Sequence, residues 1–495
     1  MNNWKQKKEE GEFSLYETVS SRVLYLTKKG EISMKRKRIG TAAVSILVIL
    51  LLGSHVMGEV KTTKKYAGTT VHLLYTALKY DQIGIEMSKP EFEQKYGIKL
   101  VIEYCPYPEM RGKSLMELSK RTGRYDLVGQ DCMWMAEFVA PGYLEPLMQY
   151  FKDPELCDPV AYDIDDFVPR ILAGHGVWKD VLYSIPFSPG AIIYELRRDV
   201  FLEAGLEYPQ TWDDLEIVLP KVHKPEEKFY GYVGQAARGV PINQMFLSFW
   251  DGCGGHIFDP GWKPAIDTPE MVKAGEFMLS LKSYMPPGVE AFGWDEMMAT
   301  FNQGYGAVTP MFSPFCMASE NPETSTIVGK VDYRPVAVGP IGKPNGFFGA
   351  WGIGIPSDSK NKEAAFLWLQ YVSSKEFQRR WVLAGGVPTR TSAFVDPEIR
   401  KKWGWMDVAH YFMMYQALPD FRPSLPEWAE IDDIMGTEIF RAWMGEITVA
   451  QAMKNSQQKT EALMERVGYY EPGAEVPPQQ WLIPHYYDRK PSSWE

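Results

Sequence analysis

The first part of the chain alternates short apolar runs with amphipathic stretches. Three runs rich in apolar and β-branched residues predict buried strands at 70–75 (TVHLLY), 98–104 (IKLVIEY) and 125–129 (YDLVG). Between them, 85–96 and 109–121 have the spacing of helices, and Gly97 predicts the end of the first one. Strands that alternate with helices indicate parallel pairing through right-handed crossovers. The pattern therefore predicts an α/β fold.

The same alternation continues along the chain. Further strands are predicted at 185–196, 229–233, 307–312, 333–338 and 351–356, and further helices at 199–205, 212–221, 242–252 and 362–373. Thr211 and Asn361 are candidate N-caps of two of these helices. From residue 396 onward the pattern is mostly helical. The Pro- and Tyr-rich tail at 471–495 has no period, which predicts an extended strap or a disordered segment.

The N-terminal part has the pattern of an export signal. Four basic residues at 35–38 precede the apolar run 39–53, and a short stretch of small and polar residues follows at 54–58. This order predicts a signal peptide, with an uncleaved membrane anchor as the alternative. In both cases the chain after about residue 59 is exported to the periplasmic or extracellular face of the membrane. Because residues 1–33 fit poorly before a signal, translation starting at Met34 is a further hypothesis.

Composition narrows the class of protein. The 495 residues are 45% hydrophobic and carry a net charge of −10, which excludes a largely disordered chain and argues against a nucleic-acid binder. Without residues 1–58 the chain has 43 basic and 58 acidic side chains, a net charge of −15. Such self-repulsion favours a soluble monomer. A single long apolar run excludes a protein with several membrane spans.

The chain lacks the common fingerprints of catalysis and cofactor binding. The five cysteines form no CxxC pair and no Cys/His cluster at zinc-ligand spacing, so we expect no metal site built on cysteine. HExxH, GxSxG and P-loop motifs are also missing from the sequence. We therefore predict a protein without a cofactor, a metal or a catalytic residue. Which cysteines pair, if any, stays open.

Several segments resemble one family, in order along almost the whole exported part. These segments are YDLVGQDCMWMAEFVAPGYLEPL at 125–147, LYSIPFSPGAIIYELRRDVF at 182–201, LEYPQTWDDL at 206–215, FLSFWDGCGGHIFD at 246–259, FNQGYGAVTPMF at 301–312, WGIGIPSDSKNKEAAFLWLQYVSS at 351–374 and GGVPTRTSAFVDPEI at 385–399. The set resembles the extracellular solute-binding proteins of ABC importers, in the sugar-type family 1 that includes maltose-binding protein.

The resemblance implies a two-lobed periplasmic-binding-protein-like fold of type II, with discontinuous lobes joined by a hinge. The first lobe is expected at 69–187 and 346–395, and the second at 188–335 and 396–470. A carbohydrate or polyol would bind in the cleft between the lobes, which would close around it. The loaded protein would deliver its ligand to the permease subunits of an ABC transporter. Membrane attachment through residues 39–58 stays open.

Hydroxyl-rich ligands need polar side chains beside aromatic rings, and such residues lie at the expected cleft. Asp131 and Trp134 follow a strand at its carboxyl end, where α/β clefts form. The resemblance adds further positions in the crossing segments and loops. The complete set of candidate ligand-binding residues is Tyr80, Asp131, Trp134, Ser188, Gln235, Arg238, Met311, Phe312, Trp351, Arg390 and Arg422. For each of them packing, capping or simple solvation is the competing explanation, and Arg390 could instead hold the hinge.

Two other functions stay open at this point. An exported glycoside hydrolase would need two carboxylates across a sugar, and Asp165, Asp166, Asp295 and Glu296 are its candidates. A ligand-sensing protein without a role in uptake is the second alternative. The sequence does not name the ligand, and Arg238, Arg390 and Arg422 leave an acidic sugar open.

Overall fold

The computed structural model describes residues 60–342, 345–419, 421–474, 476 and 479, all within one compact unit, Met57–Glu495. The predicted export signal lies outside these residues, as does most of the predicted tail. No helix in the described part is both long and apolar enough to cross a membrane. The five cysteines, all of them described, are free thiols.

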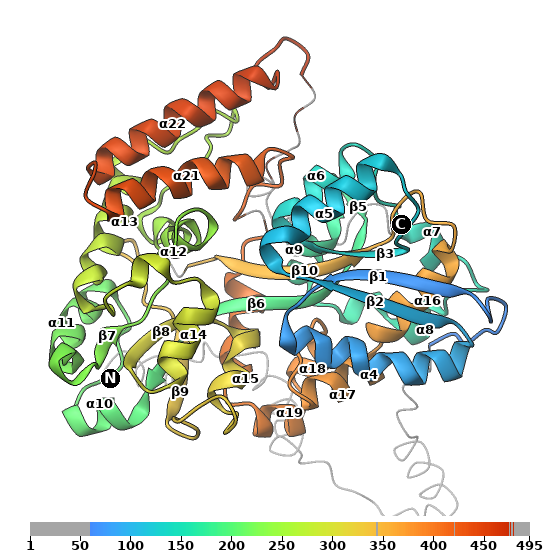
Figure 1. Ribbon diagram of the computed structural model, residues 1–495, viewed down its shortest axis with the longest axis horizontal. Helices are drawn as coiled ribbons and strands as arrows, with labels where there is room; N and C mark the ends of the chain where they lie inside the picture. The colour runs from blue at the N-terminus through green and yellow to red at the C-terminus, as the bar shows by residue number, and fades with distance from the viewer. Residues whose placement is uncertain (1–59, 343–344, 420, 475, 477–478, 480–495) are drawn as a thin grey trace, which may run out of the picture. The chain divides into compact units, whose positions relative to one another are not determined.

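The strands form one mixed sheet that supports both halves of the molecule (Figure 1). Its strands are β1 (Thr70–Thr76), β2 (Lys99–Cys105), β3 (Leu127–Asp131), β6 (Ser184–Arg197), β7 (Tyr230–Tyr232), β8 (Gly306–Phe312), β9 (Val331–Pro335) and β10 (Phe348–Gly354). The order is β2-β1-β3-β10-β6-β8-β7, with β9 also paired to β6. β1 pairs in parallel with β2 and β3, so the predicted parallel pairing of these three strands is confirmed. A separate two-stranded sheet joins β4 (Val177–Trp178) and β5 (Val181–Leu182).

Strand β6 joins the two halves of this sheet. Its first part, up to Ala191, pairs antiparallel with β10, and its second part, from Ile192, pairs antiparallel with β8 and β9. All fourteen residues of β6 are buried, as expected of a strand covered on both faces. We call the part around β1, β2, β3 and β10 lobe 1, and the part around β7, β8 and β9 lobe 2. The residue borders inferred from the sequence stay a prediction.

Helices cover both lobes. In lobe 1, α5 lies above the strands and α4 below them in the view of Figure 1, and α16 and α17 pack against α4. In lobe 2, α12 packs against α13 and α21, and α22 packs against α21. The helices in chain order are α4 (Lys79–Tyr96), α5 (Tyr107–Lys120), α6 (Met135–Val139), α7 (Met148–Phe151), α8 (Pro159–Tyr162), α9 (Pro169–Gly176), α10 (Arg198–Ala204), α11 (Trp212–Val222), α12 (Val240–Trp250), α13 (Pro269–Ser280), α14 (Trp294–Asn302), α15 (Cys316–Ser319), α16 (Lys362–Val372), α17 (Lys375–Leu383), α18 (Thr391–Phe394), α19 (Pro397–Lys402), α20 (Met406–Tyr411), α21 (Trp428–Trp443) and α22 (Val449–Arg466).

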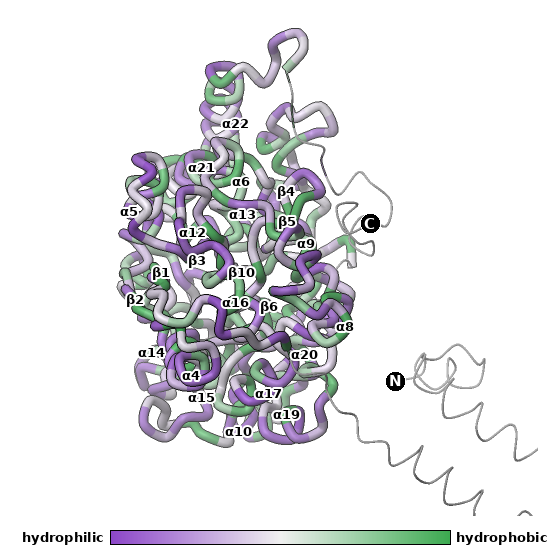
Figure 2. Tube along the Cα trace, turned by 90° about the vertical axis from the view of Figure 1, so that its right-hand side faces the viewer, coloured by the Kyte–Doolittle hydropathy of each residue, from purple (hydrophilic) through white to green (hydrophobic). Residues whose placement is uncertain are grey.

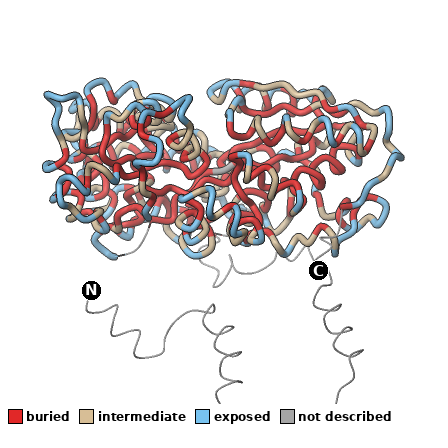
Figure 3. Tube along the Cα trace, turned by 90° about the horizontal axis from the view of Figure 1, so that it is seen from below, coloured by how far each residue is buried: buried red, intermediate tan, exposed pale blue. Residues whose placement is uncertain are grey.

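The buried residues lie where this arrangement of sheet and helices predicts. Buried segments run through the interior of each lobe, and exposed segments lie along the periphery (Figure 3). The outer turns include many hydrophilic stretches in Figure 2. Several large aromatic side chains are fully buried, among them Trp368, Trp381 and Trp405. The high aromatic content of the chain therefore serves the core to a large extent.

Local sequence signals explain where several helices begin and end. Thr211 accepts a hydrogen bond from the backbone of Asp214, whose side chain bonds back to Thr211, so the predicted cap is a complete capping box. Gly97 ends α4 in the left-handed conformation, with φ 71°, as predicted. Asn361 also stands at the N-cap position of α16, as predicted, but its side chain makes no capping hydrogen bond. Its amide donates to Asp126 and to the Thr70 carbonyl instead of capping α16, and so connects that helix to the sheet.

Candidate ligand-binding site

Three of the predicted residues lie side by side on neighbouring strands at the junction of the lobes. Trp351 on β10 is opposite Asp131 at the end of β3 and opposite Ser188 on β6. All three side chains are buried. Because β6 continues into lobe 2, this row lies where the chain crosses from one lobe to the other.

Aromatic rings surround Trp351. Its ring centroid lies 5.4 Å from that of Trp134, 5.6 Å from Tyr75 and 5.9 Å from Tyr107. Trp134 and Tyr107 are stacked, with centroids 5.7 Å apart. Such contacts fix the orientation of the rings and contribute about 0.5–1.5 kcal/mol each beyond burial. Trp134 and Trp351 thus lie side by side on a shared aromatic support.

Asp131 is held by groups from three segments. One oxygen accepts the Met133 backbone N–H, and the other accepts the Tyr107 hydroxyl at 3.2 Å. The guanidinium of Arg422 lies 3.5 Å from the first oxygen. Arg422 also donates to the Cys132 thiol and to the Phe348 carbonyl of β10. Asp131 therefore caps the short helix η1 (Cys132–Trp134) and is also part of a buried ion pair.

A second carboxyl lies at the start of α4. Asp81 is fully buried and accepts the Tyr75 hydroxyl on one oxygen at 3.0 Å, while its other oxygen has no hydrogen-bond partner in the described structure. Burial raises the pKa of Asp81 to about 7, although the nearby Ser188 hydroxyl and Tyr75 oppose the shift. The neighbouring Tyr80 contacts Phe315 of lobe 2 edge-on, with ring centroids 5.1 Å apart. The start of α4 therefore touches the opposite lobe.

Lobe 2 contributes rings and amides. Phe312 lies 4.6 Å from Trp294 between centroids, and its ring covers glycines of both crossing strands. A Cβ atom at Gly349 would lie 2.8 Å from this ring, so only glycine fits there without a shift. The Trp294 indole N–H donates to Gln244 Oε1 at 2.7 Å, and the Gln235 amide donates to the same oxygen at 3.4 Å.

A third carboxyl comes from the C-terminal helices. Asp432 on α21 accepts the amide N–H of Asn243 on α12 at 2.7 Å. Burial raises its pKa to about 7, and the charge of Arg422 partly offsets that effect. The second oxygen of Asp432 and the amide oxygen of Asn243 have no partner in the described residues. Asp131, Arg422 and Asp432 all shift the pKa of Tyr107, which places these charges around one ring.

The remaining predicted residues are placed elsewhere. Arg238 is exposed, just before α12. Met311 neighbours Phe312 on β8, so its side chain faces the other side of the strand, where it is buried in a separate apolar cluster. Of the hydrolase candidates, Asp166 bonds to Ser392 and Glu296 accepts the Gly293 N–H at the start of α14. Burial raises the pKa of the Tyr80 hydroxyl, and Asp295 lies close enough for its charge to raise that pKa further.

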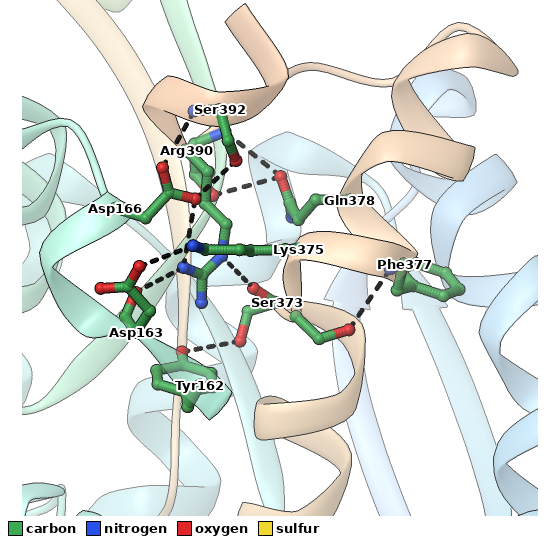
Figure 4. A network of polar contacts seen from close by, with 11 residues as sticks. Tyr162, Asp163, Asp166, Ser373, Lys375, Phe377, Gln378, Arg390 and Ser392 are labelled. Atoms are coloured by element: carbon green, nitrogen blue, oxygen red, sulfur yellow. Dashed lines mark hydrogen bonds and ion pairs between the residues drawn. The ribbon is translucent and has the colours of Figure 1, made fainter. Parts of the chain in front are cut away.

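Arg390 lies in the interior of lobe 1 (Figure 4). It donates to the backbone carbonyls of Ser373 at 2.6 Å and Asp163 at 2.7 Å. Its guanidinium also packs on the rings of Tyr162 and Phe167, at 4.8 and 4.2 Å from their centroids. These contacts connect the segment around η2 (Ile164–Asp166) to the end of α16. Of the two roles left open for Arg390, the geometry favours the structural one.

Sequence reasoning missed several polar residues of the junction, namely Asp81, Tyr107, Asn243, Gln244, Trp294 and Asp432. Asp81 follows the predicted Tyr80 directly, so the strand-end argument covers it as well. Asn243 and Asp432 are 189 positions apart and both lie inside amphipathic helices. Only the packing of α12 on α21 brings them together.

A pocket of about 510 Å³ lies in lobe 1, away from this junction. It is lined mainly by apolar and aromatic side chains, including Met148, Phe151, Cys157 and Tyr162. None of the candidate ligand-binding residues lines it, and of the hydrolase candidates only Asp165 does. The described part of the chain also holds no group of three or more His, Cys, Asp or Glu side chains able to bind a metal ion.

Comparison with known proteins shows which family this chain resembles. The family model of bacterial extracellular solute-binding proteins matches residues 81–379. A probable amino-acid ABC transporter periplasmic-binding protein of Sinorhizobium fredii is 24% identical and aligns with 82% of this chain and 92% of its own length. A mannitol-binding protein of Pseudomonas aeruginosa is 25% identical, over 79% of this chain and 92% of its own.

A solved structure is similar over the same region. It is the ABC transporter solute-binding protein of Agrobacterium radiobacter K84 in complex with ribitol, with a TM-score of 0.75 and 28% identity, and it covers 80% of this chain and 99% of its own. The likeness confirms the predicted two-lobed α/β fold. The chain belongs to the family of bacterial extracellular solute-binding proteins.

Proposed function

We propose that this protein binds a carbohydrate or polyol between its two lobes, without chemical conversion, and delivers it to an ABC importer. The support comes from the junction, where residues of both lobes and of the crossing strands meet. Relatives with about a quarter of identical residues are described as binding mannitol and ribitol. Both are acyclic polyols, so we propose this class of ligand first.

One observation carries the proposal: buried oxygens at the junction have no hydrogen-bond partner among the described residues. They belong to Asp81, Gln235, Asn243 and Asp432. A buried polar atom left unpaired costs about 1–3 kcal/mol, so such atoms indicate a missing partner. The hydroxyl groups of a polyol can donate to all of them, and the rings around Trp351 can pack on its C–H faces. A few such bonds suffice for micromolar binding, about −8 kcal/mol.

Heat stability provides the direct test. A ligand that binds only the folded protein stabilises it by about 2.7 kcal/mol at 100 times its Kd. The melting temperature should therefore rise with the concentration of ribitol, D-mannitol or a related sugar, as a thermal-shift screen would measure. Analysis of the incubated ligand should show no new product. Release of a smaller sugar would show that the protein is an enzyme. A rise in melting temperature with amino acids alone would show that the ligand is an amino acid and not a sugar or polyol.

Trp351 should contribute strongly to affinity. Trp351→Ala removes the ring that Tyr75, Tyr107 and Trp134 hold in place, so the binding free energy should weaken by about 1–3 kcal/mol, as for a buried anchor residue. Isothermal titration measures this change. Trp212→Ala is the matched control, because Trp212 is equally buried but stacks on Phe277 within lobe 2. Equal affinity losses in both variants would mean that Trp351 acts through stability alone.

The cellular setting follows from the same family. We propose that the segment after about residue 59 acts outside the cell membrane as a monomer, and that it meets the permease subunits of its transporter there. Residues 39–58 would serve as signal peptide or membrane anchor. Mass analysis of the protein from cells distinguishes the two, because cleavage removes this segment.

A further inference from the structure

In lobe 2, hydrogen bonds determine which end of the Gln244 and Gln235 side-chain amides is the oxygen and which is the nitrogen. An indole N–H can only donate, so Gln244 must present its oxygen to Trp294. Gln235 shares this oxygen and must therefore present its amide N–H to it. The remaining oxygen of Gln235 is then a buried acceptor, and it has no partner in the described structure.

The same reasoning applies around Asp432. When it is ionised, its carboxylate can only accept, so Asn243 must donate its N–H to it. This leaves the Asn243 oxygen and the second Asp432 oxygen as acceptors. The second oxygen of Asp81 makes a fourth buried acceptor without a hydrogen bond, and the Ser188 hydroxyl is the protein donor nearest to it in effect. A ligand for this site must therefore be rich in hydrogen-bond donors.

The charges at the junction also favour a ligand that donates hydrogen bonds and carries no negative charge. Three carboxyl groups lie at the junction, those of Asp81, Asp131 and Asp432, and the guanidinium of Arg422 interacts with two of them, Asp131 and Asp432. This guanidinium is already engaged by Asp131, Cys132 and the Phe348 carbonyl. The other two arginines that the sequence offered for an acidic sugar are not at the junction, since Arg238 is exposed and Arg390 is held inside lobe 1.

We propose that the site selects its ligand by charge and donor number, with Asp81 and Asp432 as the specificity-determining residues. It accepts a neutral polyol and also its terminal amine derivative, whose ammonium group offers three donors and a positive charge. It rejects the corresponding carboxylate, which brings acceptors and negative charge to carboxyl groups. This proposal rests on the proposed function and narrows its ligand class.

Titration calorimetry of the exported chain at about pH 8 tests the selection. The ligands are D-mannitol, 1-amino-1-deoxy-D-mannitol and D-mannonate, together with ribitol and its amine and carboxylate counterparts. The amine should bind at least as tightly as the neutral polyol. The carboxylate should bind at least about 100-fold more weakly, because like charges at an interface suppress binding. In Asp81→Asn or Asp432→Asn, the preference for amine over neutral polyol should fall about ten-fold or more.

Asp433→Asn is the matched control, because Asp433 neighbours Asp432 in sequence but is exposed. It removes the same charge and should keep the wild-type preference. The affinities of the wild-type protein for the neutral, amine and carboxylate ligands are measured without any variant. A variant that fails to fold therefore leaves the test of charge selection intact. Carboxylate binding within ten-fold of a bound neutral polyol would overturn charge selection and leave the proposed function intact. An unchanged preference for the amine in both Asp variants would show that Asp81 and Asp432 do not determine specificity. If no member of either ligand series binds, both this proposal and the proposed function are wrong.

Discussion

Replacing Arg390 by alanine should lower the free energy of unfolding by about 3–5 kcal/mol, the range found when one partner of a buried charge network is removed. The variant leaves the carbonyls of Ser373 and Asp163 without their donor and removes the cation between the rings of Tyr162 and Phe167. Arg390→Lys should recover little, because an ammonium group lacks the planar fork that reaches both carbonyls. Denaturant unfolding measures the loss.

Ligand affinity should stay unchanged in the Arg390 variants wherever the protein is folded, because Arg390 contacts no residue of the junction described above. Arg379→Ala is the matched control. Arg379 pairs with Asp396 and Glu398 near the surface, so its loss should cost only about 0–1 kcal/mol. A clear loss of affinity with unchanged stability would instead place Arg390 in ligand binding.

Arg390 also shows where sequence reasoning reaches its limit. A lone arginine after a turn has the same pattern whether it binds a ligand, pairs inside a lobe or points to solvent. The structure places Arg422 at the junction, Arg390 inside lobe 1 and Arg238 at the surface. Their environments depend on segments up to 290 positions away, as for Arg422 and Cys132. The spacing of apolar residues carries no information about such pairs.

The first three strands and their parallel pairing were predictable because apolar runs alternate with helices there. The antiparallel pairing of β10 and β6 was not predictable in this way, since it depends on strands that cross between the lobes. The row of Asp131, Ser188 and Trp351 could be selected as well, since strand ends and crossing segments are recognisable in the sequence. Asn243 and Asp432 could not, because each lies in a helix whose partner is chosen by tertiary packing. The sequence therefore indicated the junction residues that lie on strands better than those that lie on helices.

Three buried carboxyl groups should lower the stability of the ligand-free protein as the pH rises from about 4 to about 8. Below about pH 6.5 this loss is opposed by His175, His223 and His410, because burial lowers their pKa, so the net fall should be clearest between about pH 6.5 and 8. Burial raises the pKa of Asp81 and Asp432 to about 7 and that of Glu195 to about 8, whereas the unfolded chain releases these protons near pH 4. At these three groups the folded state then binds more protons than the unfolded state within this window, so their contribution to the free energy of unfolding falls with pH. Their contribution is complete below about pH 4 and is lost as the pH passes the folded pKa values.

A shift of about three pKa units corresponds to roughly 4 kcal/mol for one buried carboxyl, so the combined loss should reach several kcal/mol. Urea unfolding at a series of pH values measures it. Asp432→Asn should flatten the curve between about pH 4 and 7, and Glu195→Gln should flatten it up to about pH 8. Asp433→Asn should change the slope only slightly, because Asp433 is exposed and contributes less than burial and the charge of Asp131 to the raised pKa of Asp432. A slope of the same size in all variants would mean that other groups carry the pH dependence. A saturating neutral polyol should reduce the slope, because its hydroxyls donate to the ionised forms of Asp81 and Asp432 and so lower their pKa in the complex.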